Sequence, residues 1–345
     1  MSTILRYLTL AVPIVWFAQG IRIDVQAQKD RTPLIIERAP LRFIKDPNPG
    51  FSGVAVNSEH NMLVVTDENL FQILEYNVQE NTAPRARFSE PKRIISGTDT
   101  RAEMMCGVYI DPKTREIYVM NNDTQSYMPV FAPDAKGNAK PTRYLAGVRG
   151  FAIAADEQAG LLYMTNQSGS IMVYRKEAAG DDKPVRRIEG NNTLLQDPHG
   201  IVLDTRNKVI YVSNFGNVDL RAATGQGRYG KFELPSITVY PLEGQGDIKP
   251  LRVIRGPKTL MNWPSHLALH LERQELFVAN DADDSVLVFK AGDEGDAAPI
   301  RVLKGPNTGI KHPPGIAPWR SRRTGRPDPN HPGCEDWRNR QPRGC

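Results

Sequence analysis

Two histidines have the surroundings most suggestive of chemistry in this sequence. His199 lies in Asp197-Pro198-His199-Gly200, and His266 follows Trp263-Pro264-Ser265. Two imidazoles brought together could bind a metal ion or transfer protons near neutral pH. No Cys-x-x-Cys spacing accompanies them, and a structural role for both rings is the alternative.

Oxygen-bearing side chains form a second candidate set, because each ends a short apolar run. They are Asp67, Asn121, Asn166, Asn214 and Asn280. Carboxylate and amide oxygens suit a hard cation such as Ca²⁺. Asn and Asp also close turns by bonding nearby backbone. A metal site, for Ca²⁺ or Zn²⁺, formed by Asp67, Asn166, Asn214, Asn280 and His199, is therefore an expectation of one alternative only.

One long loop is the third candidate. The stretch from Asn214 to the next apolar run near Ile237 takes 23 residues, whereas the equivalent stretch from Asn280 to Val286 takes six. Long loops on a rigid scaffold often carry binding residues. We therefore include four of its side chains among the candidate binding residues: Arg221, Arg228, Tyr229 and Lys231.

The elements that position these residues belong to an internal repeat. The signature Pro-x-Arg-x-aliphatic begins at six prolines, namely Pro40, Pro91, Pro141, Pro184, Pro250 and Pro299. Between signatures come three apolar runs, of which the second ends in Asn or Asp and the third in an aromatic residue. Such runs between turn formers are typical of strands. The leading Pro suits the start of an outer strand, because it cannot donate to a ladder.

Four strands per unit of 40 to 50 residues predict an all-β, six-bladed β-propeller over residues 32–317. The strands of a blade alternate in direction, so the loops before the innermost strands and the loops after the second strands share one face. This predicts a channel mouth where the candidates meet. The residues expected just before the inner strands are Ser52, Cys106, Arg149, His199, Ser265 and Pro314.

The units resemble NHL repeats, which form six-bladed propellers of the general architecture seen in gluconolactonase-like and TolB-like proteins. The resemblance rests on runs such as Ile210–Asn214 (IYVSN) and Ile237–Tyr240 (ITVY), followed by the Pro-x-Arg signature. It implies a propeller fold. It also implies that a lactonase-like enzyme of this family would bind its metal through acidic and Asn ligands.

The sixth blade is expected to be incomplete at the C-terminus. Pro40–Ile44 is an isolated outer-strand signature, and Gly315-Ile316-Ala317 begins an inner strand. Residues 318–345 then contain seven Arg and no alternating apolar residues. Two explanations are open: this stretch is a disordered tail, or the reading frame has shifted just after Ala317.

The N-terminus is predicted to be an export signal over residues 1–27, with cleavage after Gly20 or Ala27. Arg6 precedes an apolar run of eleven residues, Leu8 to Ala18, which is too short to span a bilayer. We therefore expect a periplasmic or secreted protein with no membrane span after signal removal. An uncleaved membrane anchor is the alternative.

Charge argues against a nucleic-acid partner. The net charge is +5, but residues 28–317 sum to zero, because the excess lies at the two ends. A nucleic-acid-binding domain would need a basic stripe on its folded surface. The expected function is binding of a protein or small-molecule ligand on the loop-rich face, without catalysis, through Cys106, Arg149, His199, Ser265, His266 and the long loop. The alternative is a metal-dependent, lactonase-like hydrolase or lyase at the channel mouth.

Overall fold

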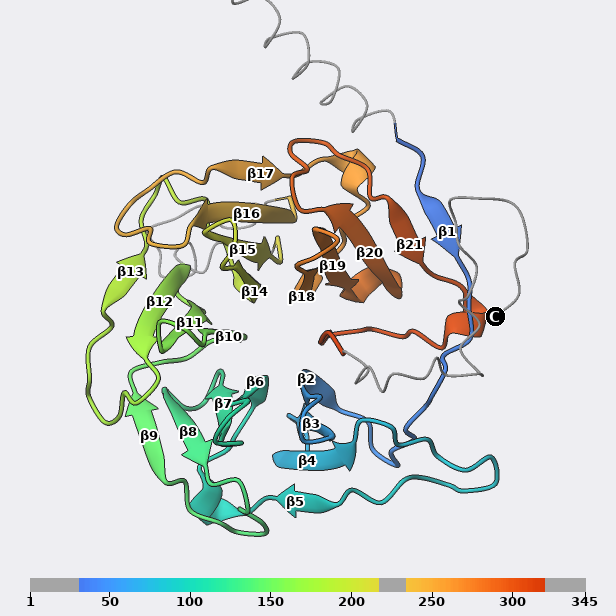
Figure 1. Ribbon diagram of the computed structural model, residues 1–345, viewed down its shortest axis with the longest axis vertical. Coiled ribbons are helices and arrows are strands. Elements are labelled where there is room, and N and C mark those ends of the chain that lie inside the picture. The colour runs from blue at the N-terminus through green and yellow to red at the C-terminus, as the bar shows by residue number, and fades with distance from the viewer. Residues whose placement is uncertain (1–30, 217–233, 320–345) are drawn as a thin grey trace, which may run out of the picture.

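The computed structural model describes residues 31–216 and 234–319 of the 345-residue chain. Five sheets, each with four antiparallel strands in chain order, are arranged around a central axis as the blades of a β-propeller (Figure 1). The first strand of each blade is nearest the axis and the fourth is outermost. The predictions for residues 1–27, for the loop residues Arg221, Arg228, Tyr229 and Lys231, and for the tail after Trp319 fall outside the described residues.

The blades are numbered in chain order. Blade 1 comprises β2 (Phe51–Asn57), β3 (Met62–Asp67), β4 (Gln72–Asn77) and β5 (Arg93–Ile95). Blade 2 comprises β6 (Met105–Ile110), β7 (Ile117–Asn121), β8 (Tyr127–Phe131) and β9 (Arg143–Ala146). Blade 3 comprises β10 (Ile153–Asp156), β11 (Leu161–Asn166), β12 (Ser170–Arg175) and β13 (Arg186–Ile188).

Blade 4 comprises β14 (Pro198–Asp204), β15 (Val209–Asn214), β16 (Ser236–Pro241) and β17 (Arg252–Ile254). Blade 5 comprises β18 (Pro264–His270), β19 (Glu275–Asn280), β20 (Ser285–Lys290) and β21 (Arg301–Leu303). Strand β1 (Leu34–Ile36) pairs in parallel with β21. Short 3₁₀ turns are η1 (Thr98–Thr100), η3 (Pro257–Thr259), η4 (Asp281–Asp283) and η5 (Pro306–Thr308).

Each blade is apolar on both faces, and the core lies between neighbouring blades. In β7, Ile117 and Val119 pack toward blade 1, whereas Tyr118 and Met120 pack toward blade 3. This follows from the two-residue period of a strand, which sends successive side chains to opposite faces. Equivalent clusters join blade 3 to blade 4 and blade 4 to blade 5.

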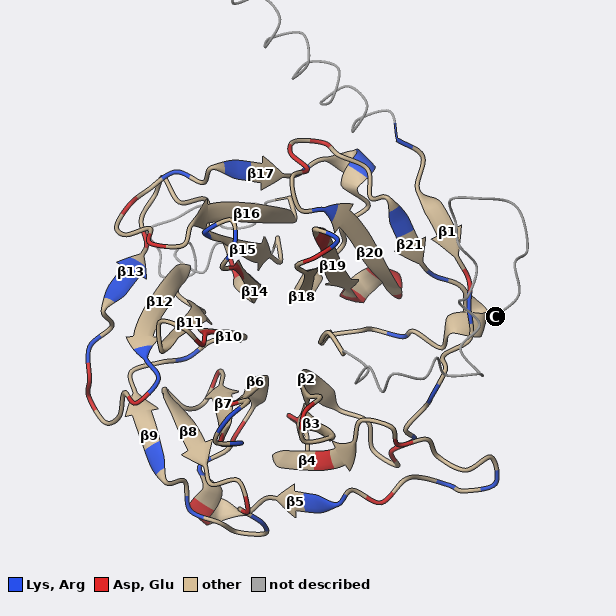
Figure 2. Ribbon diagram, viewed as in Figure 1, with Lys and Arg blue, Asp and Glu red and all other residues tan. Residues whose placement is uncertain are grey.

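The repeated Arg of the signature links the outer strand to the middle of its own blade. Arg93 binds Glu75 at 2.6 Å, Arg143 binds Glu116 at 2.6 Å, and Arg301 binds Glu275 at 2.7 Å. In blades 3 and 4 the guanidinium donates instead to the hydroxyl of Tyr163 or Tyr211. Figure 2 shows these basic residues on the outer strands β5, β9, β13, β17 and β21. The Arg is thus part of the scaffold.

The prediction of six blades is wrong, because the described residues form five. The propeller fold and the four-stranded unit are confirmed. The isolated signature at residues 40–44 finds no second and third strands in residues 31–216 and 234–319, so it cannot complete a sheet. Residues 313–317 reach the axis between β18 and β2 without forming a strand of their own (Figure 1).

In the described part of the chain, no helix has the length and apolar character needed to cross a membrane.

Candidate functional site

Six residues line the axis on one face of the ring, and we call them the rim. In the sheets, the start of the inner strand pairs with the end of the second strand, as Pro198 does with Asn214 and Pro264 with Asn280. The loops before inner strands and after second strands therefore share this face, as the alternation of strand direction predicts. The rim residues are Ser52, Cys106, Phe151, His199, Ser265 and Pro314.

Phe151, and not Arg149, takes the rim position of blade 3. In blades 1, 3 and 4 the residue after the rim residue donates its backbone N–H to a hydroxyl of the second strand: Gly53 to Thr66, Ala152 to Thr165 and Gly200 to Ser213. This register places Phe151 beside Ser52 and His199 in the repeat. Arg149 lies in the preceding turn, where its guanidinium donates to the carbonyl of Asp123 at 3.0 Å.

Four aromatic rings form a continuous row on the rim, and we call them the aromatic row. The ring centroids of Phe151 and His199 are 3.7 Å apart, those of His199 and Phe215 are 4.1 Å apart, and those of Phe215 and Trp263 are 5.1 Å apart. Three different blades, 3, 4 and 5, contribute to the row. Trp263 forms its open end, with 41% of the residue exposed. Trp263 is therefore the accessible ring of the row, and the rings behind it cover one another.

His199 carries no charge at neutral pH. Its side chain is 13% exposed, and burial lowers the pKa of the ring to about 3, with a smaller contribution from neighbouring His266. Its Nδ1 lies 3.1 Å from the backbone carbonyl of Asp197, a contact that opposes the shift. A neutral imidazole between two aromatic rings behaves mainly as a flat apolar surface with one polar edge.

His266 crosses the axis and joins three parts of the ring. It occupies the position that is Gly in blades 1, 2 and 4, and its Nδ1 lies 2.5 Å from the carbonyl of Pro314. Its Nε2 lies 3.1 Å from the carbonyl of Phe151 in blade 3. Burial lowers the pKa of His266. With both nitrogens facing backbone oxygens, this ring has no free lone pair directed at a metal ion.

A cluster of polar side chains around Cys106 lies on the opposite side of the rim from the aromatic row. The thiol of Cys106 is 3.7 Å from Oε2 of Glu68 and 3.7 Å from the side-chain amide of Asn122. Burial, and then the charge of Glu68, raise the pKa of the Cys106 thiol far above its ordinary value. The protonated thiol is a poor nucleophile. Burial also raises the pKa of Glu68, and the carboxylates of Asp123, Asp67 and Asp281 add to that increase.

The residues that end the second strands bind backbone. The side-chain oxygens of Asn121, Asn214 and Asn280 accept the N–H of Glu103, Gln196 and Asn262, which lie in the loop before the inner strand of the same blade. Asp67 and Asn166 accept N–H groups of the turns that follow them. These oxygens hold the loops of the rim in place, as the structural alternative predicts.

The described residues contain no group of three or more His, Cys, Asp or Glu side chains arranged to hold a metal ion. A Ca²⁺ or Zn²⁺ site remains a prediction of the alternative function.

The structure brings together some of the predicted residues and separates others. His199 and His266 are neighbours, and Ser265 lies beside them, donating its hydroxyl to the carbonyl of Pro313 at 3.1 Å. Cys106 and Arg149 contact neither histidine. Sequence reasoning missed Phe151, Phe215, Trp263 and Glu68. Phe215 and Trp263 directly border Asn214 and Pro264, so aromatic residues next to the repeat's own landmarks were the available signal.

No family model and no curated relative matches the chain. Among solved structures, a chain of a nidogen/laminin complex is similar, with a TM-score of 0.50, 14% identity, and coverage of 72% of this chain and 80% of that one. A hydrazine synthase chain of Kuenenia stuttgartiensis (TM-score 0.48, 12% identity, covering 70% of this chain) and the WD40 β-propeller domain of Doa1 (0.48, 10%, 76% of this chain and 71% of that one) are also similar. This chain covers 64% of that hydrazine synthase chain, which is less than two thirds of it. At these identities, the similarity shows the β-propeller fold alone.

Proposed function

We propose that this chain is an exported β-propeller of the NHL-repeat type that binds a ligand or partner at its rim and has no catalysis of its own. The aromatic row is the observation that carries the proposal. A stack of four rings from three blades, open at Trp263, is an unusual feature for a loop region whose only task is to connect strands. Tryptophan is enriched at binding surfaces, because it offers a large area with few rotatable bonds.

The ligand group that fits this row is flat and apolar, or a flat cation. Ring faces attract both, the first through dispersion and the second through the ring quadrupole. The neutrality of His199 removes a repulsive charge, and the carboxylates around Glu68 add a negative field on the same face. An aromatic or arginine side chain of a protein partner meets this description, as does a small aromatic amine.

The protonation states support binding over catalysis. Cys106 is held as a thiol, and His199 is too weak a base to take a proton efficiently at neutral pH. The side-chain oxygens predicted as metal ligands accept backbone N–H groups instead. No described arrangement favours the metal-dependent hydrolase or lyase, so it is not proposed.

The test is a ligand-observed NMR screen of the full chain against a library of aromatic and alkylammonium fragments. We expect hits whose signals are lost with Trp263→Ala and retained with Trp319→Ala. Trp319 is a matched control, because it is also 41% exposed and lies away from the row. A parallel panel of lactones and esters should show no turnover. Hydrolysis that disappears with His199→Ala would contradict the proposal.

A further inference from the structure

Between blades 5 and 1, the outer part of the ring carries the contacts that a further blade would make. In blades 2 to 5, a residue in the connection between the third and fourth strands pairs in parallel with the outer strand of the preceding blade: Gly137 with Ile95, Gly180 with Leu145, Gly246 with Ile188, and Gly295 with Ile254. Ile36 of β1 pairs with Leu303 of β21 in the same way. In each case the Pro of a signature follows four residues later.

Side chains confirm that correspondence. The residue after three of the four paired Gly residues accepts a backbone N–H from the preceding blade: Asn138 from Asp99, Asp247 from Asn192 and Asp296 from Lys258. Glu37, which follows Ile36, accepts the N–H of Asn307 at 3.1 Å in the same manner. Residues 34–44 therefore hold the position of a connection and a fourth strand, as they would in a sixth unit.

Near the axis, residues 313–317 also lie where the inner strand of a further blade would lie. A Cβ added at Gly200 would lie 2.5 Å from the carbonyl oxygen of Ser265 and 2.8 Å from the nitrogen of Leu267, because neighbouring inner strands approach closely there. A Cβ added at Gly315 would similarly lie 3.3 Å from the carbonyl oxygen of Ser52 and 3.4 Å from the backbone nitrogen of Val54 in blade 1. Residues 313–317 thus occupy the start of an inner strand.

Phe43 and Lys45 bond through their backbone to residues 81–89 of blade 1, but the backbone N–H that would meet a third strand has no partner in the described part of the chain. In all five blades the residue after the signature Pro donates its N–H to the third strand, as Lys92 does to Glu75 and Val185 does to Val173. Leu41 is the equivalent residue and has no such bond within residues 31–216 and 234–319. Ile44 is half-buried, as is its equivalent Leu303 in blade 5, whereas Ile95, Leu145, Ile188 and Ile254 are at most 1% exposed.

Arg42 indicates the chemistry of the missing pair of strands. The equivalent Arg in every blade reaches a Glu or Tyr on the second or third strand, but Arg42 is exposed and lies over the ring of Trp319 at 5.6 Å. A hairpin placed here would need alternating apolar residues and a carboxylate or phenol opposite Arg42. Residues 320–345 lack this pattern, since they contain four Pro, no aliphatic residue and one aromatic residue.

We propose that residues 34–44 and 313–317 form an acceptor for a two-stranded β-hairpin supplied by another protein. The hairpin completes the sheet by adding strands to both edges, one beside Leu41 to Ile44 and one beside Gly315. This interaction surface shares Pro314 with the rim but includes none of the four rings of the aromatic row, so its test does not depend on the proposed function.

The test uses a synthetic peptide with the sequence of Glu275–Lys290, the middle hairpin of blade 5. In blade 5 Glu275 pairs with Arg301 of the outer strand, and in the complex the same Glu would pair with Arg42. Fluorescence polarisation measures its binding to the full chain, and hydrogen exchange locates it. We expect saturable binding with new protection of the amides of Leu41, Arg42 and Ile44 and of residues 315–317, since the amides of Phe43 and Lys45 are already bonded within the chain. Arg42→Ala should weaken binding about fivefold to tenfold, and Glu275→Gln in the peptide should have the same effect without adding to it. Arg187→Ala, an exposed Arg on the outer strand of blade 3, should change nothing.

Three outcomes overturn the proposal. The first is absence of binding, or protection confined to other blades. The second is binding only after deletion of residues 320–345, which would make this chain's own C-terminal segment the occupant. The third is a dimer in which the amides of Leu41, Arg42 and Ile44 and of residues 315–317 are already protected, which would make a second copy the occupant.

Discussion

His199 illustrates how a residue type associated with chemistry can serve as part of a surface. Its ring stacks between Phe151 and Phe215, and burial keeps it neutral. The same burial makes this residue sensitive to acid, because protonation would place a charge between two aromatic rings.

The first prediction concerns this acid sensitivity. Burial lowers the pKa of His199 from 6.5 to about 3 in the folded chain. The unfolded chain therefore binds one more proton between these values, and folding stability falls as the pH drops below about 6.5. Between pH 6.5 and 4.5 the free energy of unfolding of the wild type falls, and we expect His199→Phe to remove roughly 2–3 kcal/mol of that decrease. Urea unfolding at several pH values measures this. An unchanged pH dependence, beside an exposed control such as His312→Phe, would show that His199 titrates normally.

At the residue scale, the sequence predicted which side chains share one face of the ring better than which of them are in contact. His199, Ser265 and His266 were correctly brought to one region, because they follow the landmarks of the repeat. Phe151 was missed because Gly150 resembles the small residue that starts other inner strands, which shifted the register to Arg149. The contacts of Phe215 and Trp263 depend on ring distances across blades, which a repeat alignment does not contain.

At the scale of elements, the close approach of neighbouring inner strands limits the size of the side chains that they can carry. Gly200 sits at a bulge where β14 meets β18, and the Ser213 hydroxyl bridges the two by accepting its N–H at 2.8 Å and donating to the carbonyl of Ser265. A side chain at this position has no room.

The second prediction is that Gly200→Ala destabilises the fold by about 1–3 kcal/mol, because its methyl group would displace backbone atoms of blade 5. Gly292→Ala is the matched control, since no atom lies within 4 Å of the added Cβ and its φ is not in the left-handed region. Chemical denaturation of both variants checks the difference. Equal midpoints would mean that the inner strands can separate without cost.

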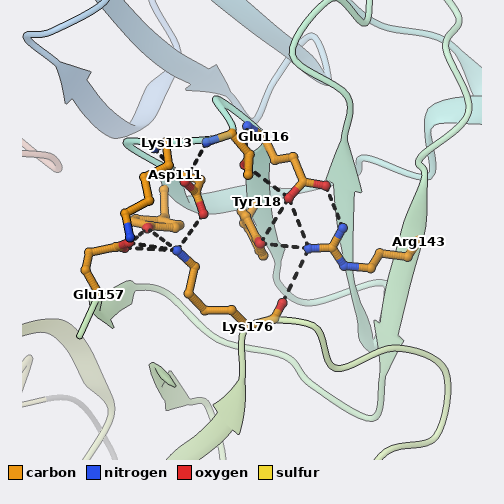
Figure 3. Close-up of polar contacts among 9 residues, drawn as sticks. Asp111, Lys113, Glu116, Tyr118, Arg143, Glu157 and Lys176 are labelled. Carbon is orange, nitrogen blue, oxygen red and sulfur yellow. Dashed lines mark hydrogen bonds and ion pairs between the residues drawn. The ribbon is translucent and has the colours of Figure 1, made fainter. Parts of the chain in front are cut away.

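Blades are also joined by buried charge, as Figure 3 shows between blades 2 and 3. Lys176 of blade 3 binds Asp111 of blade 2 at 2.5 Å and Glu157 at 2.9 Å, and it donates to the hydroxyl of Tyr109. Burial alone would lower the pKa of Lys176, but the two carboxylates raise it. Because the folded pKa of Lys176 is raised and that of Asp111 is lowered, this stabilisation is complete at neutral pH. It is lost in alkaline solution as Lys176 releases its proton, and in acid as Asp111 gains one.

The third prediction follows from that network. Lys176→Met leaves two carboxylates without their cation, and Asp111 is only 6% exposed. We expect a loss of roughly 3–5 kcal/mol, since breaking a buried pair leaves an uncompensated charge. Lys304→Met, which breaks an exposed pair with Asp283, should cost less than about 1 kcal/mol. Similar losses for the two variants would show that the interior position of Lys176 has no special weight.

For the whole molecule, the repeat predicted the propeller, its four-stranded blades and the outer position of every Pro-x-Arg signature. It did not predict five blades. Six signatures suggested six units, but a signature marks only one strand, and Pro40–Ile44 has no middle strands among the described residues to pair with. Counting complete sets of strands, rather than signatures, gives five.

The arrangement of the ring also decides what the rim can bind. Blades 3, 4 and 5 place the aromatic row on one side of the axis, and blades 1 and 2 place Glu68 and Cys106 on the other. We infer that this face binds a ligand through the row, with Trp263 as its accessible end.

The most direct measurement is an isothermal titration of the strongest fragment from the NMR screen into the wild-type chain, Trp263→Ala and Trp319→Ala. We predict that Trp263→Ala raises Kd at least tenfold, about 1.4 kcal/mol, with no change in melting temperature. Trp319→Ala should leave Kd unaltered. Equal affinities for the wild type and Trp263→Ala would contradict it, because the ligand would then bind away from the aromatic row.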